Sequence, residues 1–466
     1  MNRANLLRSR AVRALLIPRW PQLGLQLAAL TGLGMLIVVG LVGSPVGNRN
    51  LAIVAVWIGW WALLMLILVP FFGRLWCSVC PIPLPGEWLR RGAVLGPTGS
   101  NREASGEAAG RPRRNGLGRG LHWPRRLRNL WLQNAIFVGL ALTSLAILTQ
   151  PRTTAWVLLV LVGVASVVSL VFERRSFCRF LCPVGGVIGL YSQGAPLELR
   201  VVDQALCTTH VDKTCYTGND RGYGCPWQVF PATLRTNVSC GTCFECLRTC
   251  PYDNVAVRVR PFGEDLLRPG PRRVDETFKA LVLLGSVVAY AAVMLGPWGS
   301  LKAAAAGVGT TAWLVYAATF LMVSLAIAPG LYWMATSMGR AFSRVRATSA
   351  QVLSAFTPAL VPLGITAWAA FSVSFLFANL SYLWPALSDP FALGWNLLGA
   401  AGVAWSPYAS GVAPVLQAAI LLLGLVWAGA HVRRIADDLG GGLRLALPVL
   451  AFTLVPTLGL LWLLVG

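Results

Sequence analysis

The sequence predicts a polytopic α-helical membrane protein of about nine spanning helices, into which a small cysteine-rich α+β module is inserted. Hydrophobic residues make up 56% of the 466 residues and charged residues only 12%, a composition typical of membrane proteins. Seven of the eleven cysteines fall in one polar segment, 193–275, between apolar stretches. The apolar stretches therefore predict the membrane part, and the polar segment predicts the inserted module.

Nine stretches are long and apolar enough to cross a bilayer, which takes about 20 residues of helix. They lie near 23–43, 52–72, 129–149, 154–172, 278–296, 312–334, 352–378, 414–432 and 444–465. The segment 379–413 differs, because Pro385, Pro390 and Pro407 stand between its apolar patches. We expect that segment to lie along the membrane surface or to re-enter the membrane.

The net charge of +22 predicts the orientation of the chain, because basic loops stay on the cytoplasmic side of a membrane. The basic segments are 3–19, 89–128, 173–179, 340–346 and 432–444. Nine helices place all of them on one side of the cell inner membrane if the N-terminus is cytoplasmic and the C-terminus is outside. Membrane lipid is the predicted partner of this charge; basic and aromatic residues do not interleave as in nucleic-acid-binding proteins.

Hydropathy and charge together divide the chain into four segments. They are a basic cytoplasmic N-terminus (1–22), a four-helix membrane region (23–192), the cytoplasmic module (193–275) and a five-helix C-terminal membrane region (276–466). The first apolar stretch is long enough to stay as an anchor, so we expect no cleavable signal peptide.

The module contains the run Cys240-Gly-Thr-Cys243-Phe-Glu-Cys246-Leu-Arg-Thr-Cys250-Pro251. Three thiolates at this spacing can hold three corners of one iron–sulfur cluster, and the fourth cysteine, followed by proline, is directed to a second cluster. Structural zinc is the alternative, although zinc usually takes two separated Cys-x-x-Cys pairs. A reducing cytoplasm favours metal binding over disulfides. The module is therefore predicted to be ferredoxin-like and to bind iron–sulfur clusters.

The seven cysteines follow, in degenerate form, the repeat of two-cluster ferredoxins, in which each half lends its last cysteine to the other cluster. The second half is complete, while the first half keeps only Cys207, Cys215 and Cys225. By this analogy one [4Fe–4S] cluster has four cysteine ligands and the other has three. The first ligand set is Cys225, Cys240, Cys243 and Cys246, and the second is Cys207, Cys215 and Cys250.

His210 is the candidate for the missing ligand of the second cluster. It lies three residues after Cys207, where that half would carry another cysteine. Imidazole can replace thiolate on iron, and the replacement raises the reduction potential. The alternative is that His210 is an exposed loop residue. The module is thus predicted to hold one or two [4Fe–4S] clusters.

Both flanks of the cysteines predict short strands. Apolar and polar residues alternate over 197–201 before the first cysteine and over 255–260 after the last. We expect these two strands to pair antiparallel and to enclose the clusters.

Two further cysteine pairs belong to an internal repeat. The segments 74–81 and 175–183 each follow a pair of apolar stretches, and each has an arginine, an aromatic residue, two cysteines and a proline in the same order. We call these segments the exit motifs; their cysteines are Cys77, Cys80, Cys178 and Cys182. These four thiols are predicted to hold a further cluster, to form a dithiol relay, or to be buried structural thiols.

The membrane part offers little other chemistry. None of the nine apolar stretches contains Asp or Glu and no two histidines face each other, which disfavours a proton pump and a membrane haem. Trp57, Trp60 and Trp61 are interpreted as packing or interfacial residues, with the wall of a quinone pocket as the alternative. Asn134 and Asn379 are expected to make helix–helix hydrogen bonds.

At these residues the chain resembles the membrane-bound polyferredoxin-like proteins that accompany periplasmic nitrate reductase and nitrous-oxide reductase (NapH- and NosR-type), and the related cbb3-oxidase assembly proteins. The resemblance covers about 23–275 and rests on the exit motifs and on 240–251. It implies a carrier of electrons from quinol or cytoplasmic donors towards periplasmic partners. The chain differs in having two residues rather than three between Cys77 and Cys80, an incomplete first ferredoxin half, and additional helices after 275.

These patterns predict a membrane-anchored iron–sulfur electron-transfer protein that links quinol or a cytoplasmic donor to a membrane or periplasmic redox partner. The alternative is an iron–sulfur assembly or regulatory factor for another membrane or periplasmic metalloenzyme. A membrane scaffold with a zinc-stabilised module is a third hypothesis. No nucleophile–base pair, phosphate loop or nucleotide fingerprint indicates an organic substrate, so enzymatic activity is expected only as part of an oxidoreductase system.

Overall fold

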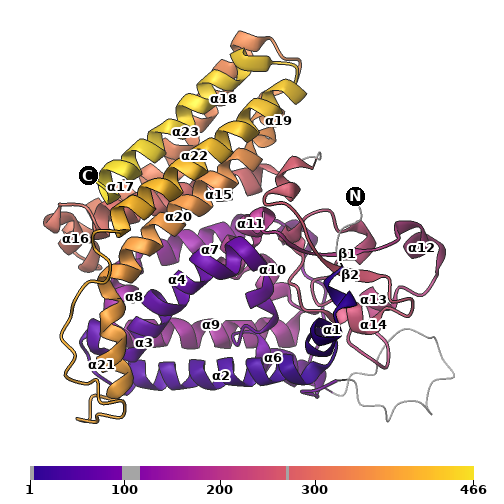
Figure 1. Ribbon diagram of the computed structural model, residues 1–466, viewed down its shortest axis with the longest axis horizontal. Coiled ribbons are helices and arrows are strands. Elements are labelled where there is room, and N and C mark those ends of the chain that lie inside the picture. Colours follow the sequence, from indigo (N-terminus) through magenta and orange to yellow (C-terminus); the bar gives the residue numbers. More distant parts are fainter. Residues whose placement is uncertain (1–4, 97–115, 269–271) are drawn as a thin grey trace. The chain divides into compact units, whose positions relative to one another are not determined.

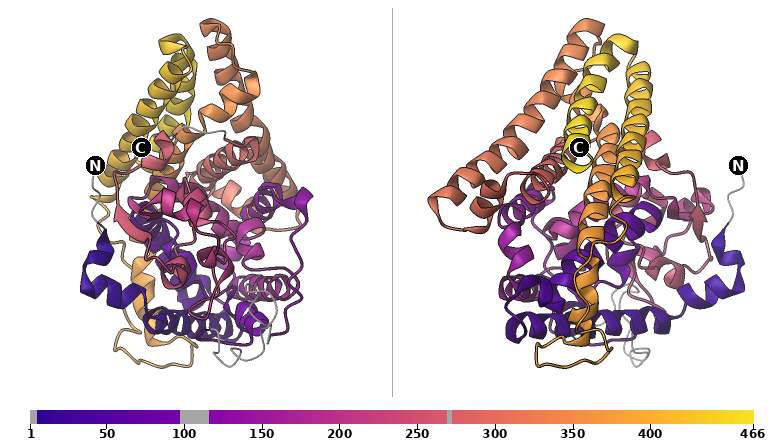
Figure 2. Two further views of the ribbon diagram at one scale, coloured as in Figure 1. Left: turned by 90° about the vertical axis from the view of Figure 1, so that its right-hand side faces the viewer. Right: turned by 60° about the vertical axis from the view of Figure 1, so that its left-hand side comes forward.

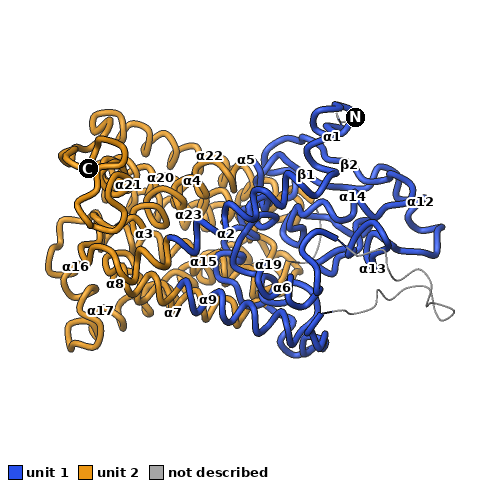
Figure 3. Tube along the Cα trace, turned by 90° about the horizontal axis from the view of Figure 1, so that it is seen from below, with its two compact units in different colours: residues 1–35, 71–129, 158–265 blue, residues 36–70, 130–157, 266–466 orange. Residues whose placement is uncertain are grey.

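The computed structural model describes residues 5–96, 116–268 and 272–466 of the chain, so the basic segments 3–19 and 89–128 are described only in part. Most of these residues are helical (Figure 1). The chain divides into two compact units (Figure 3). Unit 1 comprises Met1–Met35, Phe71–Asn129 and Leu158–Asp265, and unit 2 comprises Leu36–Pro70, Leu130–Val157 and Leu266–Gly466.

The helices and strands follow one another in this order (Figure 1). Up to residue 260 they are α1 (Arg10–Leu16), α2 (Arg19–Val42), α3 (Leu51–Ile53), α4 (Trp61–Leu63), α5 (Val69–Phe72), α6 (Leu84–Arg91), α7 (Trp131–Leu142), α8 (Ser144–Thr149), α9 (Pro151–Val171), α10 (Ser176–Phe180), α11 (Pro183–Tyr191), β1 (Leu197–Val201), α12 (Gln204–Thr209), α13 (Thr214–Thr217), α14 (Glu245–Thr249) and β2 (Val255–Val259). The later elements are α15 (Val274–Met294), α16 (Gly299–Ala306), α17 (Thr311–Leu321), α18 (Ala328–Ser343), α19 (Ser349–Ala355), α20 (Thr357–Asn379), α21 (Leu383–Ser388), α22 (Ala413–Asp438) and α23 (Gly442–Leu464).

Eight helical segments are long and apolar enough to cross a membrane, where the sequence predicted nine; only the described residues were considered. They are Arg19–Val42, Leu51–Phe72, Pro151–Val171, Val274–Met294, Thr311–Ser343, Ser349–Ser388, Ala413–Asp438 and Gly442–Leu464. The protein is therefore a multi-pass membrane protein by the length and composition of its helices.

The prediction of a continuous spanning helix over 129–149 is wrong. This stretch forms two helices, α7 of 12 residues and α8 of 6, which meet at Thr143. The Thr143 hydroxyl donates a hydrogen bond to the Gly139 carbonyl 3.1 Å away. A hydroxyl bonded one turn back along its own helix competes with the backbone and often bends the helix. Hydropathy alone does not detect such a break.

Unit 2 is built from long helices that pack side by side. Helix α20 packs against α15 and α22, and α23 packs against α22 and α18; the yellow helices α22 and α23 run next to each other (Figure 2). Helices α20 and α22 approach closely at Gly424 of α22, where a Cβ atom would overlap the side chain of Thr366 in α20. Small residues at such crossings allow the van der Waals packing that holds membrane helices together.

The polar and aromatic candidates in unit 2 mostly serve packing. Trp57 donates from Nε1 to the Thr154 hydroxyl at 3.0 Å, and the rings of Trp61 and Trp368 meet edge to face with centroids 5.4 Å apart. Asn134 donates to the Asp275 carbonyl at 3.2 Å, which confirms the predicted helix–helix hydrogen bond.

The same expectation is wrong for Asn379. Its side chain donates to the carbonyl of Phe375 at 2.8 Å, within its own helix α20. A polar side chain in a helix can bond a backbone carbonyl one turn back in its own helix instead of a neighbouring helix.

The two predicted strands are confirmed in unit 1. Strands β1 and β2 pair antiparallel, with Leu199 opposite Val257 and Val201 opposite Val255. Leu199, Val255 and Val257 are buried in an apolar cluster that also contains Cys215, Cys246 and Cys250. The period-2 alternation therefore turns one face of the ribbon towards the cysteines.

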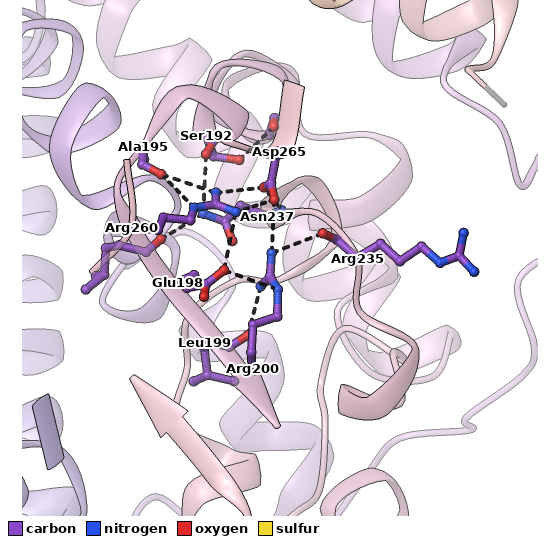
Figure 4. A network of polar contacts seen from close by, with 11 residues as sticks. Ser192, Ala195, Glu198, Leu199, Arg200, Arg235, Asn237, Arg260 and Asp265 are labelled. Atoms are coloured by element: carbon purple, nitrogen blue, oxygen red, sulfur yellow. Dashed lines mark hydrogen bonds and ion pairs between the residues drawn. The ribbon is translucent and has the colours of Figure 1, made fainter. Parts of the chain in front are cut away.

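A buried ion-pair network lies beside this ribbon (Figure 4). Asp265 accepts hydrogen bonds from Arg260 at 2.8 Å and from Arg200 at 3.3 Å, and Glu198 lies 3.4 Å from Arg260. The two carboxylates balance the two guanidinium groups, as buried charges require. Asp265 also accepts from the backbone N–H of Asn237 at 2.6 Å, so the network fixes the turn just before Cys240.

We expect Asp265→Asn to lower the free energy of unfolding by about 3–5 kcal/mol, because it leaves two buried guanidinium groups with one carboxylate. Unfolding of the detergent-solubilised protein in urea, followed by tryptophan fluorescence, measures the change. Asp253→Asn is the matched control: the Asp253 side chain is 78% exposed and lies 3.6 Å from Arg13. An exposed pair contributes about 0–1 kcal/mol. Equal effects of the two substitutions would contradict a structural role of the network.

Candidate iron–sulfur sites

All eleven cysteines lie in unit 1 and are unpaired, in three sets. The exit set is Cys77, Cys80, Cys178 and Cys182. The motif set is Cys225, Cys240, Cys243 and Cys246. The split set, whose members are far apart in sequence, is Cys207, Cys215 and Cys250. The free thiols agree with the prediction of metal binding rather than a disulfide framework.

The exit set is formed by short turns that follow the spans Leu51–Phe72 and Pro151–Val171 in the chain. Cys77 lies in a 3₁₀ turn, Leu75–Ser78, and Cys178 lies in α10. Cys182 caps the N-terminus of α11, where its Sγ accepts a hydrogen bond from the Gly185 N–H at 3.2 Å. The two copies of the motif thus carry their thiols on short turns of different geometry.

Thiols of the two exit motifs influence each other's pKa values. Burial raises the pKa of Cys80, and the nearby thiols of Cys182 and Cys77 raise it further. Burial also raises the pKa of Cys182, to about 11, and Cys77 adds to this rise. The pKa of Cys178 is raised well above its ordinary value by burial, which the charge of Arg175 offsets in part. The thiols of the two motifs are therefore close enough to interact, and burial favours the protonated form of Cys80, Cys178 and Cys182 when no metal is bound.

Arg175 ties this site together. Its side chain is 4% exposed and contacts Glu87 of α6 through Nε–Oε1 at 2.5 Å and Nη2–Oε2 at 3.2 Å. Its Nη1 donates to the Cys77 carbonyl at 2.5 Å, and its backbone N–H donates to the Pro226 carbonyl at 3.1 Å. Burial alone would raise the pKa of Glu87, but the charges of Arg175 and Arg91 outweigh it, so the pKa is lowered and Glu87 is ionised.

The motif set surrounds a cavity. All four of its sulfur-bearing residues line this cavity, together with apolar side chains that include Trp227 and Phe244. The pKa of Cys246 is raised by burial first and then by the other three thiols, Cys243, Cys240 and Cys225. The sequence analogy that joined Cys225 to the 240–251 motif therefore agrees with the arrangement of these residues.

The loop around this cavity has an unusual backbone. Thr242 and Phe244 both have positive φ values, 47° and 62°, which side chains other than glycine rarely adopt. Between Cys240 and Thr242, a Cβ atom on Gly241 would overlap the indole of Trp227. Strained residues of this kind persist where the surroundings require them, and they cluster at ligand-binding sites.

The split set is brought together by one asparagine. Asn254 donates from Nδ2 to Cys207 Sγ at 3.2 Å and from its backbone N–H to Cys250 Sγ at 3.4 Å. Burial raises the pKa of Cys215 to about 12, with further increases from Cys250 and Cys207. Hydrogen bonds to sulfur favour the thiolate form that a metal binds.

His210 is partly buried, and its ring lies 5.0 Å from that of Tyr252, two residues after Cys250. Its Nδ1 is buried and has no hydrogen-bond partner among the described residues. This favours the ligand hypothesis over that of an exposed loop residue. Ligation by His210 stays a prediction.

Three residues of the exit site were not singled out as functional from the sequence: Arg74, Arg175 and Glu87. The signal for the arginines is their position, three residues before the first cysteine in both exit motifs. Glu87 gives no such signal, because it pairs with an arginine 88 positions away in the chain.

The thiol sets fit a cluster better than a single ion. Zinc holds sulfur at about 2.3 Å in a tetrahedron, so its thiolates lie about 3.8 Å apart. Within the described ranges no three His, Cys, Asp or Glu side chains are arranged to hold one metal ion. A [4Fe–4S] cube spreads its ligands over a wider shell, as an apolar cavity lined by four cysteines allows.

Comparison with known proteins supports this assignment. A family model described as a 4Fe-4S binding domain matches the chain twice, at residues 53–97 and 154–197. Each match contains one exit motif, whereas the 240–251 motif lies outside both. The comparisons with curated proteins and with solved structures gave no match. The match supports iron–sulfur binding of the ferredoxin type, and its two regions are consistent with one or two [4Fe–4S] clusters.

Proposed function

We propose that the chain is a membrane-anchored iron–sulfur protein that passes electrons between quinol or a cytoplasmic donor and a membrane or periplasmic redox partner. The observation that carries this proposal is the gathering of eleven unpaired cysteines in one compact unit, with the exit set following directly on two spans. Clusters so placed would receive electrons from a soluble or a lipid-soluble donor while the protein stays anchored in the membrane.

In this proposal the exit set and the motif set each hold one [4Fe–4S] cluster, and the split set with His210 holds a further one. The clusters supply one-electron chemistry. The chain holds them by thiolates, keeps water away by burial, and surrounds them with guanidinium groups. Arg174, for example, donates to the Cys225 carbonyl at 2.6 Å. Positive charge and hydrogen bonds near the sulfurs favour the reduced state and raise the reduction potential.

The orientation belongs to the same proposal. In this proposal α7 and α8 together make one interrupted crossing, so that the charge pattern supports a cytoplasmic N-terminus and a cytoplasmic ferredoxin-like module in the inner membrane, with the C-terminus outside. The β1–β2 pair and the two thiol sets around it support the module itself. The exit motifs and the module together support a NapH- or NosR-type protein, in contact with membrane lipid and with a quinol or protein redox partner.

We expect Cys182→Ala to remove one reducible cluster, because it deletes a ligand of the exit set. Electron paramagnetic resonance of the anaerobically purified, dithionite-reduced protein should lose one signal, and the iron content should fall. Cys225→Ala is the matched variant of the motif set and should remove a different signal. If Cys182→Ala leaves the spectrum and iron content of wild type unchanged, the exit thiols are structural and hold no cluster.

A quinol-oxidation assay separates electron transfer from the assembly or regulatory alternative. We expect the clusters to become reduced when the pure, oxidised protein in lipid vesicles is mixed with a quinol. The bleaching of the visible absorption measures this reduction. The Cys182→Ala and Cys225→Ala variants show whether each site is required. Clusters that dithionite reduces but that neither quinol nor a cytoplasmic ferredoxin reduces would favour the assembly or regulatory role.

A further inference from the structure

Arg74 and Arg175 occupy equivalent places in the two exit motifs, and both are buried, with 5% and 4% of their surface exposed. The two guanidinium groups have different partners. Arg175 forms a two-point ion pair with Glu87. Arg74 donates from Nη1 to the Val238 carbonyl, while its Nε and Nη2 have no hydrogen-bond partner in the part of the chain that the structure describes. One of the two equivalent cations therefore has no counter-ion among the described residues.

A buried, unpaired guanidinium group is strongly unfavourable, because it loses its hydration without gaining an anion. Stacking on an aromatic ring compensates only in part: the guanidinium carbon of Arg74 lies 4.2 Å from the centroid of the Trp227 ring. The site therefore requires an anion that is not a side chain of the described residues.

The surroundings of Arg74 indicate which anion this is. On one side it precedes Cys77 by three residues and approaches α11, where a Cβ atom on Gly189 would lie 2.8 Å from Nη1. On the other side its partners Val238 and Trp227 are each two residues from a cysteine of the motif set. The guanidinium group thus faces both the exit set and the motif set.

The charge of a cluster would complement this geometry. A [4Fe–4S] cluster held by four thiolates carries net negative charge in both of its redox states. Two such clusters would supply the counter-charge that Arg74 lacks.

We propose that Arg74 is the shared counter-ion of two iron–sulfur clusters, one on the exit set and one on the motif set, and that it keeps their reduction potentials high and close together. This inference rests on the proposed function. An electron that passed from one cluster to the other would leave the summed charge beside Arg74 unchanged, with no bond formed or broken. A cation that faces both clusters therefore stabilises either distribution of the electron.

The test is a potentiometric titration of the anaerobic protein, followed by electron paramagnetic resonance, in wild type, Arg74→Met and Arg74→Lys. Methionine keeps much of the length of the side chain but removes its charge. We expect Arg74→Met to lower the reduction potentials of both clusters, with at least a tenfold change in each redox equilibrium, or about 59 mV for one electron. Arg74→Lys should keep most of the wild-type potential. Arg13→Met, at a side chain that is 59% exposed, is the matched control and should leave both potentials unchanged.

If Arg74→Met does not hold its clusters, the iron content of the variants is measured instead of the potentials. Loss of iron from both sets in Arg74→Met but not in Arg74→Lys would support the counter-ion role. Equal loss in the two variants, unchanged potentials with full iron content, or a shift confined to one cluster would overturn it. Wild-type protein without [4Fe–4S] signals would instead overturn the proposed function, so the two failures are distinguishable.

Discussion

The rest of unit 1 depends on one constraint: its buried cysteines must be able to carry negative charge. Burial raises the pKa of thiols in all three sets, which keeps them protonated when nothing is bound. Binding an iron–sulfur cluster requires the thiolate and so replaces protons with metal. The fold therefore has to provide positive charge and N–H groups close to sulfur. The hydrogen bonds from Asn254 to two sulfurs and the N-cap at Cys182 follow from this single requirement.

The structure meets that requirement with charges that are themselves held in place. Arg175 is fixed by Glu87 and by carbonyls from two loops, so the exit motif cannot rearrange without breaking a buried ion pair. Asp265 fixes the turn before Cys240 in the same way, through Arg200, Arg260 and a backbone N–H. Buried ion pairs add little net stability compared with apolar packing, but they are specific in geometry. Here that specificity fixes the loops that carry the cysteines.

Sequence patterns predict those features that depend on neighbouring residues. The alternation over 197–201 and 255–260 predicts the strand pair. Of the nine spans that hydropathy predicts, eight are found as helices long enough to cross a membrane among the described residues. The cysteine spacing predicts the motif set and the split set as ligand sets; residues of each set lie near one another in the structure, and their ligation stays a prediction. Hydropathy does not predict the break at Thr143, because the apolar residues continue on both sides of it.

The charge partners of the sites could not be predicted, for a different reason. Glu87 and Arg175, or Arg74 and Trp227, are far apart in the sequence, and only the fold brings them together. The exit cysteines were predicted with three alternatives left open, and the family match at 53–97 and 154–197 favours the cluster alternative. The repeated arginine before each first cysteine was the one local signal for the charged surroundings of that site.

The content of iron, acid-labile sulfide and zinc in the anaerobically purified full-length protein tests the central claim most directly. Iron and sulfide in equal amounts, with zinc near zero and every cysteine recovered as a free thiol after the cluster is removed, is the result expected if the thiol sets hold [4Fe–4S] clusters. Stoichiometric zinc without sulfide, or cysteines recovered as disulfides, would contradict that claim.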